Sequence, residues 1–131
     1  MLYKQFKELE LSSLGFGTMR LPLIPGGGEQ DIDQETLDHM VDCAIAGGVN
    51  YFDTAYPYHG GCSELAIGKS LARYPRESFY LADKFPGHQI VKGVKKLDPE
   101  TIFEEQLKKC GVEYFDFYLL HNINEHSMSY Y

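Results

Sequence analysis

The chain has 131 residues, 44% of them hydrophobic and 24% charged, which is enough to bury the core of one globular domain. Its formal net charge is −7 and its lysines and arginines do not cluster, which is not typical of a nucleic-acid-binding protein, whose affinity rests on neutralising phosphates. Three widely spaced cysteines without a CxxC pair argue against a disulfide framework, and no run approaches the ~18 apolar residues of a membrane span. We therefore expect a soluble, cytoplasmic protein with neither a nucleic-acid nor a membrane partner.

The first predicted element is a small β-hairpin within residues 1–13, where Phe6, Leu9 and Leu11 alternate loosely with charged residues. Residues 14–19 then predict a short strand that runs into a loop rich in proline and glycine. The three consecutive glycines of this loop lack the lysine of a phosphate-binding loop, so we interpret them as a connector.

The next predicted element is a helix that begins after Asp33, a residue type that caps helix N-termini well. Gly47 and Gly48 end it, because glycine tolerates the left-handed conformation of a helix C-terminus. The apolar stripe of this helix is expected to consist of Leu37, Met40, Val41, Ala44 and Ile45.

The strand–helix cycle then repeats twice. The predicted elements are a strand over residues 49–53, a helix capped by Ser63 that continues to about Ala72, a strand over residues 78–84, a helix that begins at Asp98-Pro99-Glu100 and ends at Gly111 with Ile102, Phe103, Leu107 and Cys110 on its inner face, and a strand over residues 115–121. The basic run at residues 92–96 is interpreted as a solvated loop or helix face.

Strands that alternate with helices predict right-handed βαβ crossovers and an α/β fold with about four parallel strands, built from βα units over residues 14–131. Two architectures satisfy this pattern. A small doubly wound sheet fits the length of the chain by itself. An eight-fold βα barrel needs about 250 residues, so the chain would supply only its N-terminal half. Length favours the first architecture, and the motifs favour the second.

Polar side chains lie where the predicted strands end, and the carboxyl ends of parallel strands meet at one face. Asp53, Lys84 and His121 end the second, third and fourth strands, and Tyr58 lies in the loop after Asp53. Each of these residues also has a purely structural interpretation, such as a turn cap, a surface lysine, a core histidine or one of ten tyrosines. Their matching places in successive βα units make joint coincidence a poor explanation.

This set of groups suits carbonyl reduction. A tyrosine hydroxyl ordinarily has a pKa near ~10, which a neighbouring ammonium lowers, and a carboxylate keeps that ammonium charged and in place. A histidine can donate a hydrogen bond to a carbonyl oxygen as negative charge develops on it. No amino acid supplies hydride, so the chemistry implies a nicotinamide cofactor.

Four stretches resemble the aldo/keto reductase family in their order and spacing: residues 14–22 (LGFGTMRLP), 53–58 (DTAYPY), 81–84 (LADK) and 115–121 (FDFYLLH). The resemblance covers essentially the whole chain and implies the N-terminal half of a (β/α)8 barrel. Residues 56–64 (YPYHGGCSE) look most like a bacterial branch whose full-length members carry a C-terminal ferredoxin-like iron–sulfur segment.

The resemblance also implies roles for the site residues. Tyr58 would be the general acid, Lys84 would activate it, Asp53 would pair with Lys84, and His121 would orient the substrate carbonyl. The loop after the first strand and the acid of the second would hold the nicotinamide ribose of NADPH, which maps cofactor binding onto Gly17, Thr18, Met19 and Asp53.

Asp83 departs from the family pattern, which more often has threonine before the lysine, although strand alternation is expected to point its side chain away from Lys84. His59 and Cys62 have the spacing of a metal-ligand pair, but the sequence lacks a second pair, so no metal site is expected.

Two further alternatives remain open from the sequence. In the first, the chain is an inactive half-barrel fragment or an assembly module without the cofactor-binding half. Its bare strand edges would promote self-association, because inner-face side chains such as Phe16, Phe52, Leu81 and Leu119 would lack their opposite layer. In the second, Lys84 forms a Schiff base, as in an aldolase-type barrel.

Overall fold

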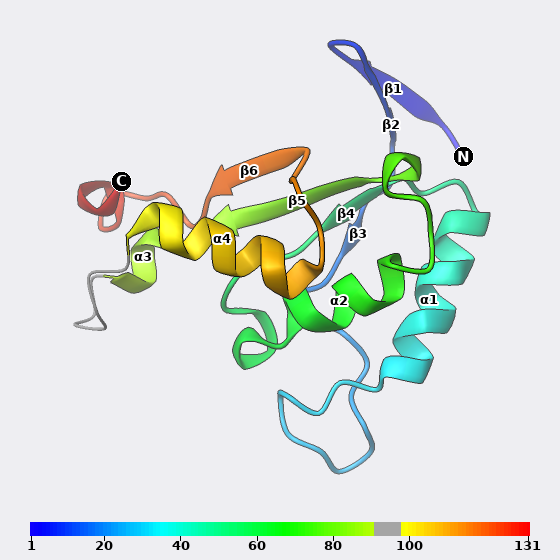
Figure 1. Cartoon of the computed structure of the whole chain (residues 1–131), viewed down its shortest axis with the longest axis horizontal. Coiled ribbons are helices and arrows are strands. Elements are labelled where there is room, and N and C mark those ends of the chain that lie inside the picture. The colour runs from blue at the N-terminus through cyan, green and yellow to red at the C-terminus, as the bar shows by residue number, and fades with distance from the viewer. Residues whose placement is uncertain (91–97) are drawn as a thin grey trace.

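A computed structural model describes residues 1–90 and 98–131, so the basic run at residues 92–96 lies outside the described part of the chain. Its elements, shown in Figure 1, are β1 (Tyr3–Phe6), β2 (Leu9–Ser12), β3 (Phe16–Gly17), α1 (Gln34–Ala46), β4 (Tyr51–Asp53), η1 (Tyr58–Gly61), α2 (Ser63–Leu71), η2 (Arg76–Ser78), β5 (Tyr80–Phe85), α3 (Gly87–Ile90), α4 (Pro99–Cys110), β6 (Phe117–Leu120) and η3 (Met128–Tyr130). None of these described helices is long and apolar enough to cross a membrane.

The predicted parallel sheet is confirmed. Its four strands lie in the order β3-β4-β5-β6, and each pair of neighbours is parallel. The register places Phe52 beside Leu81 and Lys84 beside Leu119. Helices α1, α2 and α4 cover one side of this sheet, as Figure 1 shows. This alternation of strand and helix brings the carboxyl ends of β4, β5 and β6 to the same rim.

The core lies between the sheet and these helices. Phe52 and Leu81 are fully buried there among side chains of α1 and α2, and Phe16 is partly buried against the same cluster. The expectation that these three residues face the inside of a barrel is therefore wrong. Successive side chains of a strand point to opposite faces of the sheet. Because Asp53 and Lys84 lie on the inner face, Phe52 and Leu81 lie on the face that the helices cover.

On the inner face of the sheet, Leu119 is 41% exposed, as the prediction of an uncovered inner layer requires. The opposite end of this face is closed by the predicted hairpin, which is confirmed as antiparallel strands β1 and β2. The Phe6 ring lies 5.9 Å from that of Phe117, and Tyr51 lies 5.3 Å from Phe117, centroid to centroid. The hairpin therefore covers the amino ends of the strands and leaves their carboxyl ends open.

Helix α1 begins and ends where the sequence predicts. The Asp33 carboxylate accepts a hydrogen bond from the Thr36 amide at 3.0 Å, and Gly48 has φ +89° just after the helix. Leu37 and Val41 of the predicted stripe are fully buried, whereas Met40 is 41% exposed. Met40 lies at the edge of the stripe, in an open apolar groove between α1 and β3.

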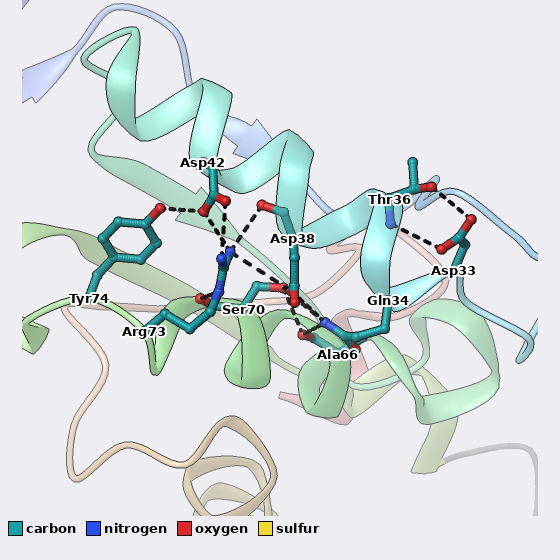
Figure 2. Close-up of polar contacts among 9 residues, drawn as sticks. All are labelled: Asp33, Gln34, Thr36, Asp38, Asp42, Ala66, Ser70, Arg73 and Tyr74. Atoms are coloured by element: carbon teal, nitrogen blue, oxygen red, sulfur yellow. Dashed lines mark hydrogen bonds and ion pairs between the residues drawn. The ribbon is translucent and has the colours of Figure 1, made fainter.

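A set of polar contacts holds α1 against α2 (Figure 2). Ser70 donates to the Asp38 carboxylate at 2.6 Å, and Gln34 Nε2 donates to the Ala66 carbonyl at 3.1 Å. Arg73, just after α2, forms an ion pair with Asp42 at 2.7 Å. The Arg73–Asp42 ion pair is solvent-exposed and contributes little energy, whereas the contacts of Ser70 and Ala66 lie in the partly buried space between the helices.

Helix α2 does not begin as predicted. Cys62 occupies the N-cap position and Ser63 is the first helical residue. The Ser63 hydroxyl instead donates to Thr18 Oγ1 at 2.8 Å and lies 3.0 Å from Thr54 Oγ1. These three buried hydroxyls join the loops that follow β3 and β4 to the start of α2. Ser63, a residue type that often caps helices, thus makes a contact between distant segments instead.

Helix α4 agrees with its predicted signals. Asp98 accepts a hydrogen bond from the Thr101 amide at 3.0 Å, and Gly111 ends the helix in the left-handed conformation at φ +67°. Ile102 and Cys110 are buried as expected, but Gln106 is fully buried as well. Its amide is satisfied there, because Nε2 donates to Glu64 and to the Lys84 carbonyl.

Candidate active site

The structure brings all four predicted site residues together at the carboxyl rim of the sheet. Asp53 is the last residue of β4, Lys84 lies near the end of β5, and His121 directly follows β6. Tyr58 begins η1 in the loop after β4. This rim lies opposite the hairpin, on the face that the helices leave uncovered.

Lys84 is at the centre of the cluster. Its Nζ lies 2.6 Å from Asp53 Oδ1, 2.8 Å from the Thr54 carbonyl oxygen and 3.3 Å from the Tyr58 hydroxyl oxygen. Its side chain is only 14% exposed. An ammonium has three protons to donate, and these three oxygens accept all of them. Lys84 is therefore held as a charged donor that links the Asp53 carboxylate to the Tyr58 hydroxyl.

The loop that carries Tyr58 is anchored by its neighbour His59, which is buried at φ +54°. His59 Nε2 accepts a hydrogen bond from the Leu21 amide at 2.9 Å, and its Nδ1 donates to the Glu29 carbonyl at 2.8 Å. Both ring nitrogens are therefore used to connect η1 to the long loop between β3 and α1. His59, a residue type that suggested a metal ligand, serves as a structural link here.

His121 packs edge-on against Tyr58, with ring centroids 5.6 Å apart and an interplanar angle of 88°. Burial, and then the neighbouring His88 and Lys84, lower the pKa of His121 to about 4. The imidazole is therefore neutral near pH 7. Its Nδ1 is buried without a hydrogen-bond partner among the described residues.

The loop after β3 contributes the predicted cofactor-binding residues in different ways. Gly17 pairs with Asp53 in the sheet, and a β-carbon at Gly17 would meet no atom within 4 Å. Met19 is 63% exposed. Thr18 is fully buried, and both its amide and its hydroxyl donate to the Asp53 carbonyl at 3.0 Å. Gly17 thus borders open space beside Asp53 and Met19 is exposed to solvent, whereas the Thr18 side chain holds the backbone of Asp53.

Asp83 points to the face opposite Lys84, as strand alternation predicts. It is fully buried beside Glu64, and its Oδ1 accepts the Lys84 amide at 2.8 Å. Burial, and then the charge of Glu64, raise the pKa of Asp83 to about 8. Gln106 donates to Glu64 at 2.9 Å and to the Lys84 carbonyl at 3.2 Å. Polar groups therefore hold the Lys84 backbone from beneath the sheet.

Two residues near the site were missed from the sequence. Glu64 is fully buried and pairs with Lys109 at 2.9 Å, and nothing in its local pattern distinguishes it from a solvated helix residue. His88 lies in α3, four residues after Lys84, and contacts His121. The strand-end rule that selected Lys84 also applies to the loop after it and could have found His88.

Comparisons with known proteins agree with one another. The model of the "Aldo/keto reductase family" matches residues 13–128. The chain is 31% identical to the NADH-specific methylglyoxal reductase of Escherichia coli over 87% of this chain and 39% of that protein.

Two crystal structures also match the fold. One, of the thermostable aldo-keto reductase Tm1743 with the inhibitor epalrestat, aligns with a TM-score of 0.73 and 31% identity over 96% of this chain and 44% of that one. The other, of an aldo-keto reductase from Klebsiella pneumoniae with NADPH, aligns with a TM-score of 0.70 and 22% identity over 95% and 41%. The chain thus spans about two-fifths of the length of these proteins, and its four parallel strands and their helices form part of the same α/β barrel fold.

Proposed function

Because this chain belongs to the aldo/keto reductase family over residues 13–128, we propose that it carries the reaction centre of a carbonyl reductase that uses NADPH. The observation that carries the proposal is the Lys84 ammonium, which lies between the Asp53 carboxylate and the Tyr58 hydroxyl at 2.6 and 3.3 Å. The substrate would be an aldehyde or a ketone. NADPH, when bound, supplies hydride to the carbonyl carbon.

Tyr58 would donate its hydroxyl proton to the carbonyl oxygen as that oxygen gains negative charge. The products are an alcohol, the oxidised cofactor and a tyrosinate. The ammonium of Lys84 stabilises this tyrosinate because opposite charges attract strongly where little water is present. The Asp53 carboxylate keeps the ammonium charged and directs it, and a proton from solvent then restores the tyrosine.

His121 would stabilise the same oxygen by donation from Nε2. A neutral imidazole has one N–H, and an N–H buried without an acceptor is rarer and costlier than a buried lone pair. Because Nδ1 of His121 is the buried nitrogen without a partner in the described structure, we assign the proton to Nε2. His121 then acts as a fixed, uncharged hydrogen-bond donor to the developing oxyanion.

The residues beside Asp53 fit a nicotinamide. Gly17 is on the inner side of β3, where the absence of a side chain leaves open space next to the Asp53 carboxylate. That carboxylate is 30% exposed, so it is accessible to a ribose hydroxyl while it pairs with Lys84. The Klebsiella protein is crystallised with NADPH and the Escherichia coli relative is NADH-specific, so the choice between the two nucleotides is itself open to test.

The first experiment is a fluorescence titration of the purified chain with NADPH and with NADH, followed by a carbonyl-reduction assay with methylglyoxal and other small aldehydes. We expect saturable binding of NADPH, and we expect Tyr58→Phe to lower kcat by about 10²- to 10⁴-fold while the Kd for the nucleotide stays the same. The conservative variant Tyr80→Phe, which removes a hydroxyl from the same sheet, is the matched control and should retain activity.

A folded chain that binds neither nucleotide would favour the alternative, a non-catalytic assembly module. One observation supports that alternative: Leu119 and Leu120 of β6 are 41% and 49% exposed. The Schiff-base interpretation of Lys84 is disfavoured, because an amine nucleophile must be uncharged and Lys84 donates to three oxygens as an ammonium.

A further inference from the structure

The backbone of His121 is held from both sides at the end of β6. Its amide donates to the Phe85 carbonyl at 3.0 Å, which continues the parallel pairing of β5 with β6. Its carbonyl oxygen accepts from His88 Nδ1 at 3.1 Å and also from the Tyr131 hydroxyl. These two donors come from segments that follow β5 and β6. A carbonyl beyond the regular ladder therefore has two side-chain donors, which fix the direction in which the chain leaves the strand.

The His88 ring also contacts the His121 ring directly. The two centroids are 4.8 Å apart and the rings are nearly perpendicular at 79°. Tyr58 contacts the His121 ring in a similar edge-to-face geometry at 5.6 Å. The His121 imidazole thus packs against one ring from η1 and one from α3, and loss of the His88 ring would leave space into which His121 can rotate.

The hydrogen bond defines the proton position on His88. A carbonyl oxygen can only accept, so His88 carries a proton on Nδ1, and its neutral form has an unprotonated Nε2. The groups that face His121 are Tyr58 from η1, Asp53 from β4, Lys84 from β5, His88 from α3 and Tyr131 after η3. Among them, His88 and Lys84 both oppose protonation of His121, and Asp53 favours it.

We propose that His88 is a positioning residue for His121: its Nδ1–H holds the His121 carbonyl and its ring holds the His121 imidazole against Tyr58. This inference deepens the proposed carbonyl reduction and rests on it for its catalytic consequence. His88 itself has no contact with the reacting atoms in this scheme. It acts by keeping the neutral imidazole where the substrate oxygen would lie.

Two variants separate the hydrogen bond from the ring. In His88→Asn the amide nitrogen lies close to the place of Nδ1 and can still donate to the His121 carbonyl. In His88→Ala both the donor and the ring are lost. His39→Ala, which removes an exposed imidazole from α1, is the matched control.

The first readout is independent of activity. In the 131-residue chain labelled with ¹³C and ¹⁵N histidine, the His121 ring should show cross-relaxation with the Tyr58 ring, and its titration should lie well below that of an exposed histidine. We expect His88→Ala to weaken the cross-relaxation and to move the His121 titration to higher pH. His88→Asn, which keeps the hydrogen bond without the ring, should give a result between those of His88→Ala and the parent, and His39→Ala should change neither property. An unchanged His121 contact and titration in a folded His88→Ala variant would overturn the proposal.

The second readout is kinetic. We expect His88→Ala to lower kcat by about 10- to 100-fold with little change in KM, and His88→Asn to recover the part of this loss that is due to the hydrogen bond. A His88→Ala variant with the kcat of the parent would overturn the positioning role. If no variant and no parent reduces carbonyls, but the resonance changes occur as expected, the geometry of His88 stands and the proposed reductase function fails.

Discussion

At the scale of single residues, Asp83 and Lys84 are neighbours with opposite surroundings. Lys84 faces the open rim, where an acid, a carbonyl and a hydroxyl accept its protons. Asp83 faces the helices, where it is fully buried, and its Oδ2 has no partner among the described residues. A carboxylate in this place is costly, because burial and the charge of Glu64 both oppose ionisation. Asp83 therefore retains its proton near neutral pH.

This buried proton predicts a pH-dependent stability. The pKa of Asp83 is about 8 in the folded chain and ~3.9 in an unfolded one, so between these values the folded state holds a proton that the unfolded state has released. Stability should therefore fall as pH rises from ~4 to ~8. Asp83→Asn resembles the protonated acid, and we expect it to flatten this fall and to be more stable than the parent at pH 9.

Denaturant unfolding at pH 5, 7 and 9 measures this effect. Glu104→Gln, an exposed carboxylate of α4, serves as the control and should leave the pH dependence of the parent unchanged. Parallel stability profiles for the parent and Asp83→Asn would contradict a retained proton at this site.

At the scale of secondary-structure elements, local signals predicted helix ends well where the capping group had no competing contact. Asp33, Asp98 and Gly111 act as their residue types suggest, because a cap is a contact between residues three or four apart. Ser63 failed as a cap because Thr18 and Thr54 bind its hydroxyl. These partners are 45 and nine residues away, so the few residues around Ser63 that are used to identify a cap include neither.

The contact between α2 and α4 yields a prediction at this scale. Gly68 of α2 lies against the α4 backbone, where a β-carbon would be 2.5 Å from the Cys110 carbonyl oxygen. Helix propensity alone would make Gly68→Ala stabilising by about 1 kcal/mol. We expect the opposite sign, a destabilisation of about 1–3 kcal/mol, because the rigid backbone of α4 must move.

Thermal and denaturant unfolding check the sign of this change. Lys69→Ala, at the adjacent exposed position of α2, is the control and should alter stability little. A Gly68→Ala chain as stable as the parent would show that the two helices separate easily.

At the scale of the whole molecule, the sheet has two edge strands among the described residues, β3 and β6. Tyr118, Leu119 and Leu120 of β6 are 38%, 41% and 49% exposed, and the groove beside β3 is apolar. An exposed apolar edge strand is a template for pairing with another chain. Such a surface is compatible with the barrel fold of the family, in which strands have neighbours on both sides.

We therefore expect the chain at high concentration to self-associate through the edge of β6. Sedimentation velocity should show an average mass that rises with concentration, and Leu120→Lys should weaken the association by about tenfold or more, since ~1.4 kcal/mol corresponds to tenfold. Leu65→Lys is a matched control because Leu65 is 45% exposed and belongs to helix α2, not to the edge strand. A parent chain that stays monomeric at every concentration would contradict this prediction.

Much of this molecule can be predicted from its residues alone. The hairpin, the parallel order of the strands and the meeting of Asp53, Lys84 and His121 follow from periodicity, caps and strand ends, and the family follows from motifs such as residues 53–58. These inferences succeed because they depend on neighbours in the chain or on rules common to all parallel sheets. The resemblance to an iron–sulfur branch stays a prediction.

Other features required the folded structure. The sequence pattern does not reveal which face of the sheet Phe52 occupies or that acids are buried beneath Lys84. It also does not reveal that Thr18 and His88 hold other residues in place. Each depends on contacts between segments about twenty or more residues apart, or on which face of the sheet the helices cover. Such contacts determine burial and desolvation, and these in turn set the protonation of Asp83 and His121.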